Sequence, residues 1–191
     1  MTTAPQRKDA ARNWERIVAV AREVVADRTP LQLNDIARRA GMGVGTVYRH
    51  FPTAEALLET VATPSLEALA AHGEQALAEA NPQRALTDFL TRTIEAQVTD
   101  AALSPVTAAP QDALPRTTEL KRILRSLGEQ LFARARAAEV VRGDLTSDDL
   151  VPLMCGVAFA ANMHTSPATR LQTARRYLTA LLEGLYTSPE P

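Results

Sequence analysis

Residues 33–51 read LNDIARRAGMGVGTVYRHF, and this stretch decides the fold of the chain. Its apolar residues recur three and four positions apart, which predicts one short helix over 33–40 and a second over 44–51. Gly41 suits the left-handed backbone that closes a helix, and Pro52 stops the second helix. Two short helices joined by a tight glycine-bearing turn have the layout of a helix-turn-helix.

The remaining sequence has the same helical spacing. Because no segment alternates β-branched or aromatic residues with period two, the sequence predicts an all-α fold of about nine helices. Pro64 removes a backbone donor and should kink or split the fourth helix. Three prolines between residues 101 and 116 predict a broken connector instead of one continuous helix. The predicted helices span residues 8–27, 33–40, 44–51, 54–80, 82–101, 116–140, 146–164 and 166–186.

Capping residues support three of these helix starts. Thr53 is expected to cap the fourth helix, and Thr146 with Asp149 three positions later resembles a capping box. Ser166 followed by Pro167 is typical of the start of a helix, since proline is preorganised for the first helical position.

Charge divides the chain unevenly. Residues 1–52 carry nine Lys and Arg against five Asp and Glu, whereas the rest carries twelve against seventeen. Contacts from Lys and Arg to phosphates supply the sequence-independent part of affinity for DNA. The asymmetry therefore indicates that the front segment meets a polyanion. The outward side of the predicted helix over 44–51 offers donors, a methyl group and an aromatic hydroxyl, which suit a groove lined with phosphates and base edges.

Residues 36–61, IARRAGMGVGTVYRHFPTAEALLETV, resemble the signature of the TetR family of bacterial repressors. The matching features are the IA-x-x-AG turn and the GT-x-Y-x-HF recognition helix, and the resemblance extends over residues 8–62. It implies a DNA-binding domain over 1–53 and an effector-binding and dimerisation domain over 54–191. The implied function is a transcriptional repressor that a small-molecule effector releases from a double-stranded DNA operator.

The resemblance also implies which residues contact DNA. Gly43 stands where many members have a Ser or Thr cap, and Val44 where many have Lys or another polar residue. The residues implied to touch bases or phosphates are Arg7, Lys8, Val44, Gly45, Thr46, Tyr48, Arg49, His50 and Thr53.

Two copies of the chain are expected to act together. A helix-turn-helix protein usually reads two half-sites, so its recognition helices must be held about one DNA turn apart. Residues 148–162 are apolar on nearly every side, and the helix over 166–186 carries a leucine stripe. These two helices are the candidate homodimer interface, arranged with their symmetry mates as a four-helix bundle.

An effector cavity is implied between the fourth helix and the three helices after it. Few aromatic and scattered polar residues favour a modest apolar ligand, whose identity the sequence does not give. The expected lining residues are Phe89, Thr93, Phe132, Met154 and Asn162.

Other functions find less support in the sequence. The three histidines lie far apart, so no metal site or cofactor is expected. The glycines at 41–45 have neither a strand before them nor a Gly-Lys-Ser/Thr after them, which excludes a phosphate-binding loop. A small helical enzyme using His164 or Cys155 lacks an acid–base pair. An activator or a ligand-independent DNA-binding protein shares every N-terminal feature and stays open.

The expected compartment is the cytoplasm. Cys155 cannot form an internal disulfide, and residues 1–28 do not resemble a signal peptide. Residues 150–169 lack charged side chains but contain two prolines and several polar residues, so we expect a buried helix and a turn there and no membrane span.

Overall fold

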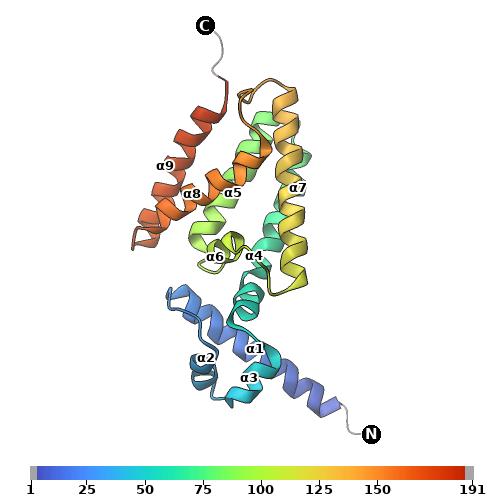
Figure 1. Cartoon of the computed structure of the whole chain (residues 1–191), viewed down its shortest axis with the longest axis vertical. Helices are drawn as coiled ribbons and strands as arrows, with labels where there is room; N and C mark the ends of the chain where they lie inside the picture. The colour runs from blue at the N-terminus through green and yellow to red at the C-terminus, as the bar shows by residue number, and fades with distance from the viewer. Residues whose placement is uncertain (1–3, 188–191) are drawn as a thin grey trace.

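The computed structural model describes residues 4–187, with side chains from residue 8 onward. Every regular element in this range is an α-helix, as the sequence predicts (Figure 1). Two lobes stack along the long axis in Figure 1, with α1–α3 in one, α5–α9 in the other, and α4 running between them. The nine helices of the described range are α1 (Ala4–Ala26), α2 (Leu33–Ala40), α3 (Val44–His50), α4 (Ala54–Leu77), α5 (Pro82–Thr99), α6 (Leu103–Ala108), α7 (Pro115–Ala137), α8 (Ser147–Asn162) and α9 (Pro167–Leu185).

Two hydrophobic cores hold the helices together. The first core joins α1–α3 to the N-terminal part of α4, and α6 and the start of α7 add Leu103, Val106 and Leu120 to it. The second core joins the end of α4 to α5, α7, α8 and α9. Since α4 contributes side chains to both cores, it ties the helix-turn-helix to the larger helical body. The division of the chain at residue 53 stays a prediction.

Pro64 does not split α4, which continues through it as one helix of 24 residues. Of the two outcomes expected at Pro64, a kink or a split, the split is therefore wrong. Pro64 is exposed, whereas Val61, Ala62 and Leu66 around it are buried in the first core. Burial of these neighbours on both sides of the proline offsets the missing backbone hydrogen bond, because tertiary packing supplies most of the stability of a helix in a protein.

The connector between α5 and α7 is broken, as expected, and part of it forms a short helix. α6 forms over Leu103–Ala108 although Pro105 lies within it. Pro105 is the third helical residue, where the backbone N–H has no partner inside the helix in any case. Leu103 and Val106 are buried in the first core, so packing compensates for the shortness of the helix.

The predicted helix starts are confirmed. The Thr53 hydroxyl accepts a hydrogen bond from Ala56 N at 3.1 Å. The Asp149 carboxylate accepts from both the backbone N–H and the hydroxyl of Thr146, at 2.8 and 2.9 Å. These bonds hold the pKa of Asp149 below its ordinary value. Ser166 caps α9, with Pro167 as its first residue.

The charge-free stretch 150–169 forms most of α8, a turn and the start of α9. The helix and the turn are as expected, but the helix is not buried on every side, since Val151 and Phe159 are exposed. Among the described helices, none combines the length and the apolar character that crossing a bilayer would require.

Candidate nucleic-acid interface and ligand cavity

The angle between α2 and α3 is fixed by a left-handed residue and a small core. Gly41 ends α2 with φ at 62°, and the next backbone N–H, that of Met42, bonds to Ala37 O at 2.9 Å. Ala37, Ala40 and Val47 are completely buried where the two helices approach. Gly41 therefore has the backbone conformation that the sequence predicted.

The outward face of α3 is open to solvent. The side chains of Val44 and Tyr48 are 45% and 47% exposed, although both are large and partly apolar. Arg49 is exposed and folds along its own helix, where it donates to Gly45 O at 3.3 Å and Thr46 Oγ1 at 3.2 Å. These two bonds orient the guanidinium before any partner arrives, which reduces the entropy that binding would cost.

The other predicted DNA contacts lie near helix ends. Thr53 is exposed, and because its oxygen accepts the capping bond, its O–H remains free to donate. Lys8 is exposed on α1. His50 is half-buried at the end of α3. The predicted contact Arg7 lies outside the residues whose side chains are described.

A polar contact links the helix-turn-helix lobe to the larger lobe. Arg28, which follows α1, adopts φ of 54° and donates from Nη2 to Asn162 Oδ1 at 3.1 Å. Partial burial and then the positive charge of Arg170 lower the pKa of Arg28. Asn162 is the last residue of α8, and it makes this contact between lobes instead of lining the ligand cavity.

A cavity of about 410 Å³ opens within the larger lobe, among α4, α5, α6, α7 and α8. Three of the five expected lining residues, Phe89, Thr93 and Met154, line it. Phe132 is instead buried in the second core. Leu69 of α4 both lines the cavity and belongs to the first core, which it shares with α1–α3. The volume falls in the range typical of small-molecule sites.

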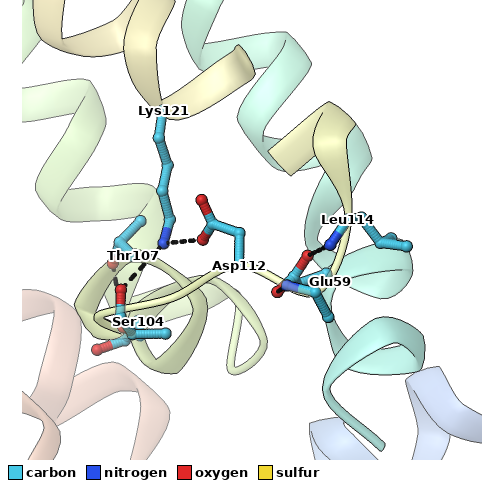
Figure 2. Close-up of polar contacts among 8 residues, drawn as sticks. Glu59, Ser104, Thr107, Asp112, Leu114 and Lys121 are labelled. Carbon is cyan, nitrogen blue, oxygen red and sulfur yellow. Dashed lines mark hydrogen bonds and ion pairs between the residues drawn. The ribbon is translucent and has the colours of Figure 1, made fainter. Parts of the chain in front are cut away.

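Apart from Thr93, the polar residues that line this cavity were not predicted from the sequence. Gln97 on α5 is only 5% exposed and lines the cavity, yet its amide makes no hydrogen bond within the described residues. Lys121 on α7 also lines the cavity. Its Nζ donates to Ala109 O at 3.3 Å and to Asp112 Oδ1 at 2.5 Å (Figure 2). Neither residue stands out in the sequence, because each is one polar side chain on an otherwise ordinary helix.

The loop that carries Asp112 is also fastened to α4. Glu59 is only 4% exposed, and its two carboxylate oxygens accept from Ala113 N at 2.7 Å and Leu114 N at 2.8 Å (Figure 2). A buried carboxylate is costly unless it is hydrogen-bonded, so these two bonds make the loop a necessary partner of α4.

An apolar surface covers the outer side of α8. Phe159 and Met163 are 72% and 75% exposed, and Val151 on α8 and Tyr177 on α9 are exposed as well. Phe159 and Met163 are four residues apart, which places them next to each other at the end of the helix. Large apolar side chains exposed together are typical of an interaction site.

Cys155 lines the cavity and is half-buried, and burial raises the pKa of its thiol. A raised pKa keeps the thiol protonated and therefore a poor nucleophile. Across the part of the chain that the structure describes, no three His, Cys, Asp or Glu side chains come together as a metal site would require.

An exposed recognition helix at one end of an all-helical body defines a DNA-binding protein of the helix-turn-helix class. Residues 17–61 match the family described as "Bacterial regulatory proteins, tetR family", and residues 81–187 match "Transcriptional regulator SbtR-like, C-terminal domain". The chain belongs to the TetR family of bacterial transcriptional regulators, as the resemblance of residues 36–61 implied.

Solved structures agree with this assignment. A TetR transcriptional regulator from Streptomyces coelicolor shares 30% identity, with 92% of this chain and 99% of that chain covered and a TM-score of 0.55. A TetR regulator from Mycobacterium vanbaalenii shares 28% identity over 96% and 100% of the two chains, with a TM-score of 0.52. A Bacillus subtilis regulator in complex with stearoyl-CoA has the same fold at 17% identity, covering 90% and 99%, with a TM-score of 0.63. No curated protein matched the chain.

Proposed function

We propose that this regulator is a homodimeric repressor that holds double-stranded operator DNA through α3 and releases it when a small molecule occupies the cavity. One observation carries the proposal: α4 packs in the same core as the helix-turn-helix, and its Leu69 lines the cavity. A ligand that changes the position of α4 therefore acts on the element that supports α3. The structurally similar Bacillus subtilis regulator was solved in complex with stearoyl-CoA, which supports the proposal that a protein of this fold binds a small molecule.

The proposed DNA contacts divide by role. Val44, Gly45, Tyr48 and Arg49 have exposed positions on α3 that suit base edges in the major groove. Contacts to phosphates and to the DNA backbone position the protein on the duplex without reading its sequence. The backbone contacts we assign are Arg7, Lys8, Thr46, His50 and Thr53.

We assign the homodimer interface to the exposed apolar face of α8 together with α9. Phe159 and Met163 would be covered by the same face of a second copy, which is how a two-fold interface forms. Burying two large apolar side chains from each copy contributes roughly 1.5–3 kcal/mol per side chain. A dimer places two α3 helices on one duplex, whose half-sites the pair reads together.

Release follows from a shift in population. A ligand that binds more tightly to a conformer unable to span both half-sites lowers operator affinity by the ratio of its affinities for the two conformers. Because the operator is chromosomal DNA, the regulator acts in the cytoplasm.

Selection from a random pool of duplexes tests the DNA-binding half of the proposal. We expect the full chain to enrich one two-fold symmetric sequence. Tyr48→Ala and Arg49→Ala should each abolish its preference for that sequence and leave the circular dichroism unchanged. Arg92→Ala, an exposed arginine on α5, is the matched control and should bind normally. Lys8→Ala should weaken binding to all sequences and reduce the salt slope by about one unit.

A small-molecule screen tests the second half. Compounds that raise the melting temperature should also release the selected operator, and a reporter placed behind that operator should rise when such a compound is added. A reporter that rises on adding the protein alone would instead show activation. Failure to prefer any duplex over random competitor would refute the proposed function as a whole.

A further inference from the structure

The cavity is lined by apolar residues and by several polar or charged ones, among them Gln97, Lys121, Arg125, Glu129 and Asp148. Gln97 is a largely buried residue, and its amide makes no hydrogen bond among the described residues. Lys121 supplies an ammonium that keeps one N–H unused after its bonds to Ala109 and Asp112. Because Gln97 lines the cavity and its amide has no protein partner among the described residues, a ligand that bonds to this amide gains affinity and specificity.

We infer that the effector is a compact apolar acid, and that its carboxylate binds Lys121 in place of Asp112. This inference rests on the proposed function, since it specifies the chemistry of the same cavity. A carboxylate accepts several hydrogen bonds, so one group can take an N–H from Lys121 and another from Gln97. A ligand amine would be repelled at Lys121 and would have to pair with Glu129 or Asp148, which also line the cavity.

Competition with Asp112 follows from the burial of this ion pair. The side chains of Lys121 and Asp112 are 22% and 12% exposed, so little water separates or screens them. A second carboxylate at Lys121 Nζ would lie beside the Asp112 carboxylate, and two like charges in a poorly hydrated site repel strongly. The ligand therefore displaces Asp112 toward solvent.

Displacement of Asp112 reaches α4 through the loop between α6 and α7. The two residues after Asp112 donate their backbone N–H groups to Glu59 of α4 (Figure 2). If the loop leaves, the Glu59 carboxylate stays buried without donors unless α4 moves to hydrate it. Leu57 and Val61, on either side of Glu59, pack in the core with the helix-turn-helix, so α3 follows α4.

Matched sets of ligands test the head group. Each set consists of three compounds with the same apolar scaffold, which carries a carboxylic acid, a primary amide or an amine. The melting temperature of the full chain is measured with each compound. In sets that bind, we expect the acid to raise the melting temperature most. Lys121→Met should remove this preference. Arg125→Met, one turn further along α7 and also lining the cavity, should retain it.

A second variant tests the connection to α4 without a ligand. Asp112→Asn removes the ion pair, so operator affinity should fall about fivefold or more in the absence of any compound, which is the lower end of typical allosteric coupling. Asp144→Asn breaks an exposed ion pair with Arg142 and should bind the operator normally. Because either single change at the buried pair can destabilise the fold, the double variant Lys121→Met/Asp112→Asn is measured beside them and should match Asp112→Asn.

The outcomes separate this inference from the proposed function. Sets that bind with no preference for the acid, or a preference that survives Lys121→Met, overturn the inference alone. A folded Asp112→Asn protein with wild-type operator affinity overturns the connection to α4. If no compound of any head group binds while the protein still recognises the operator, both the proposed effector response and this inference are refuted.

Discussion

Gly73 of α4 is the position where one added methyl group should be least tolerated. A Cβ there would lie 2.8 Å from Leu127 Cδ1 and 3.0 Å from a ring carbon of Phe89. Both neighbours are buried, and although Phe89 borders the cavity, the closer contact is with Leu127, which does not. Overpacking of this kind costs about 1–3 kcal/mol, and the helix preference of alanine over glycine returns about 0.5–1 kcal/mol. We therefore expect Gly73→Ala to lower the free energy of unfolding, by up to about 2.5 kcal/mol.

Gly128 provides a control that faces the same ring. A Cβ at Gly128 on α7 would lie 3.6 Å from another ring carbon of Phe89, which is an ordinary van der Waals separation. The helix preference then acts alone, so Gly128→Ala should raise the free energy of unfolding by about 0.5–1 kcal/mol. Two identical substitutions on either side of Phe89 should thus have opposite signs.

Urea unfolding followed by circular dichroism measures both variants. The protein concentration must be held constant, because the stability of a dimer depends on it. For a chain of this length, 1 kcal/mol corresponds to about 2–4 °C in melting temperature. If Gly73→Ala proved as stable as Gly128→Ala, the packing of α4 against Leu127 and Phe89 would be looser than the structure indicates, and our reasoning would be refuted.

Three further predictions concern single contacts. Gly41→Ala should lower the melting temperature, because a side chain at φ of 62° costs about 1–2 kcal/mol; an unchanged value contradicts this. A double-mutant cycle of Arg28→Ala and Asn162→Ala should give a coupling energy of about 0.5–1.5 kcal/mol in urea unfolding, and additive effects would show that their bond contributes nothing. Burial raises the pKa of Tyr186, so its contribution to stability should be constant below the ordinary phenol pKa of 10.0 and decline as the pH rises through the raised value. Urea unfolding across that pH range should show a shallower decline for Tyr186→Phe, and identical slopes would exclude Tyr186 as the cause.

Local signals predicted the fold well. The helix-turn-helix depends on residues within about twenty positions, and the turn at Gly41 follows from the backbone freedom of that one residue. Proline signals were less reliable. Pro64 and Pro105 both lie inside helices, because burial of their neighbours outweighs the lost backbone bond. Such burial depends on side chains from distant helices, which no local window of sequence contains.

The candidate sites differ in how much the sequence reveals. Resemblance located the exposed face of α3, whereas periodicity could not distinguish a cavity wall from ordinary core, as Phe132 shows. The two backbone N–H groups that donate to Glu59 lie more than fifty positions later in the sequence. The residues next to Glu59 in the sequence therefore do not reveal that it is buried. Gln97 likewise appears as one more polar residue on a helix until the fold places it against the cavity.

The makeup of the first core has a consequence for engineering. The helix-turn-helix rests on Leu103, Val106 and Leu120, which come from the far side of α5 in the sequence. A DNA-binding fragment that ends at residue 53 would lack these three side chains. The apolar residues of α1–α3 that pack in the first core would then be exposed to water. Exchange of only the outward residues of α3 between relatives should therefore transfer DNA specificity. Transfer of residues 1–53 without the parts of α4, α6 and α7 that complete the first core should fail.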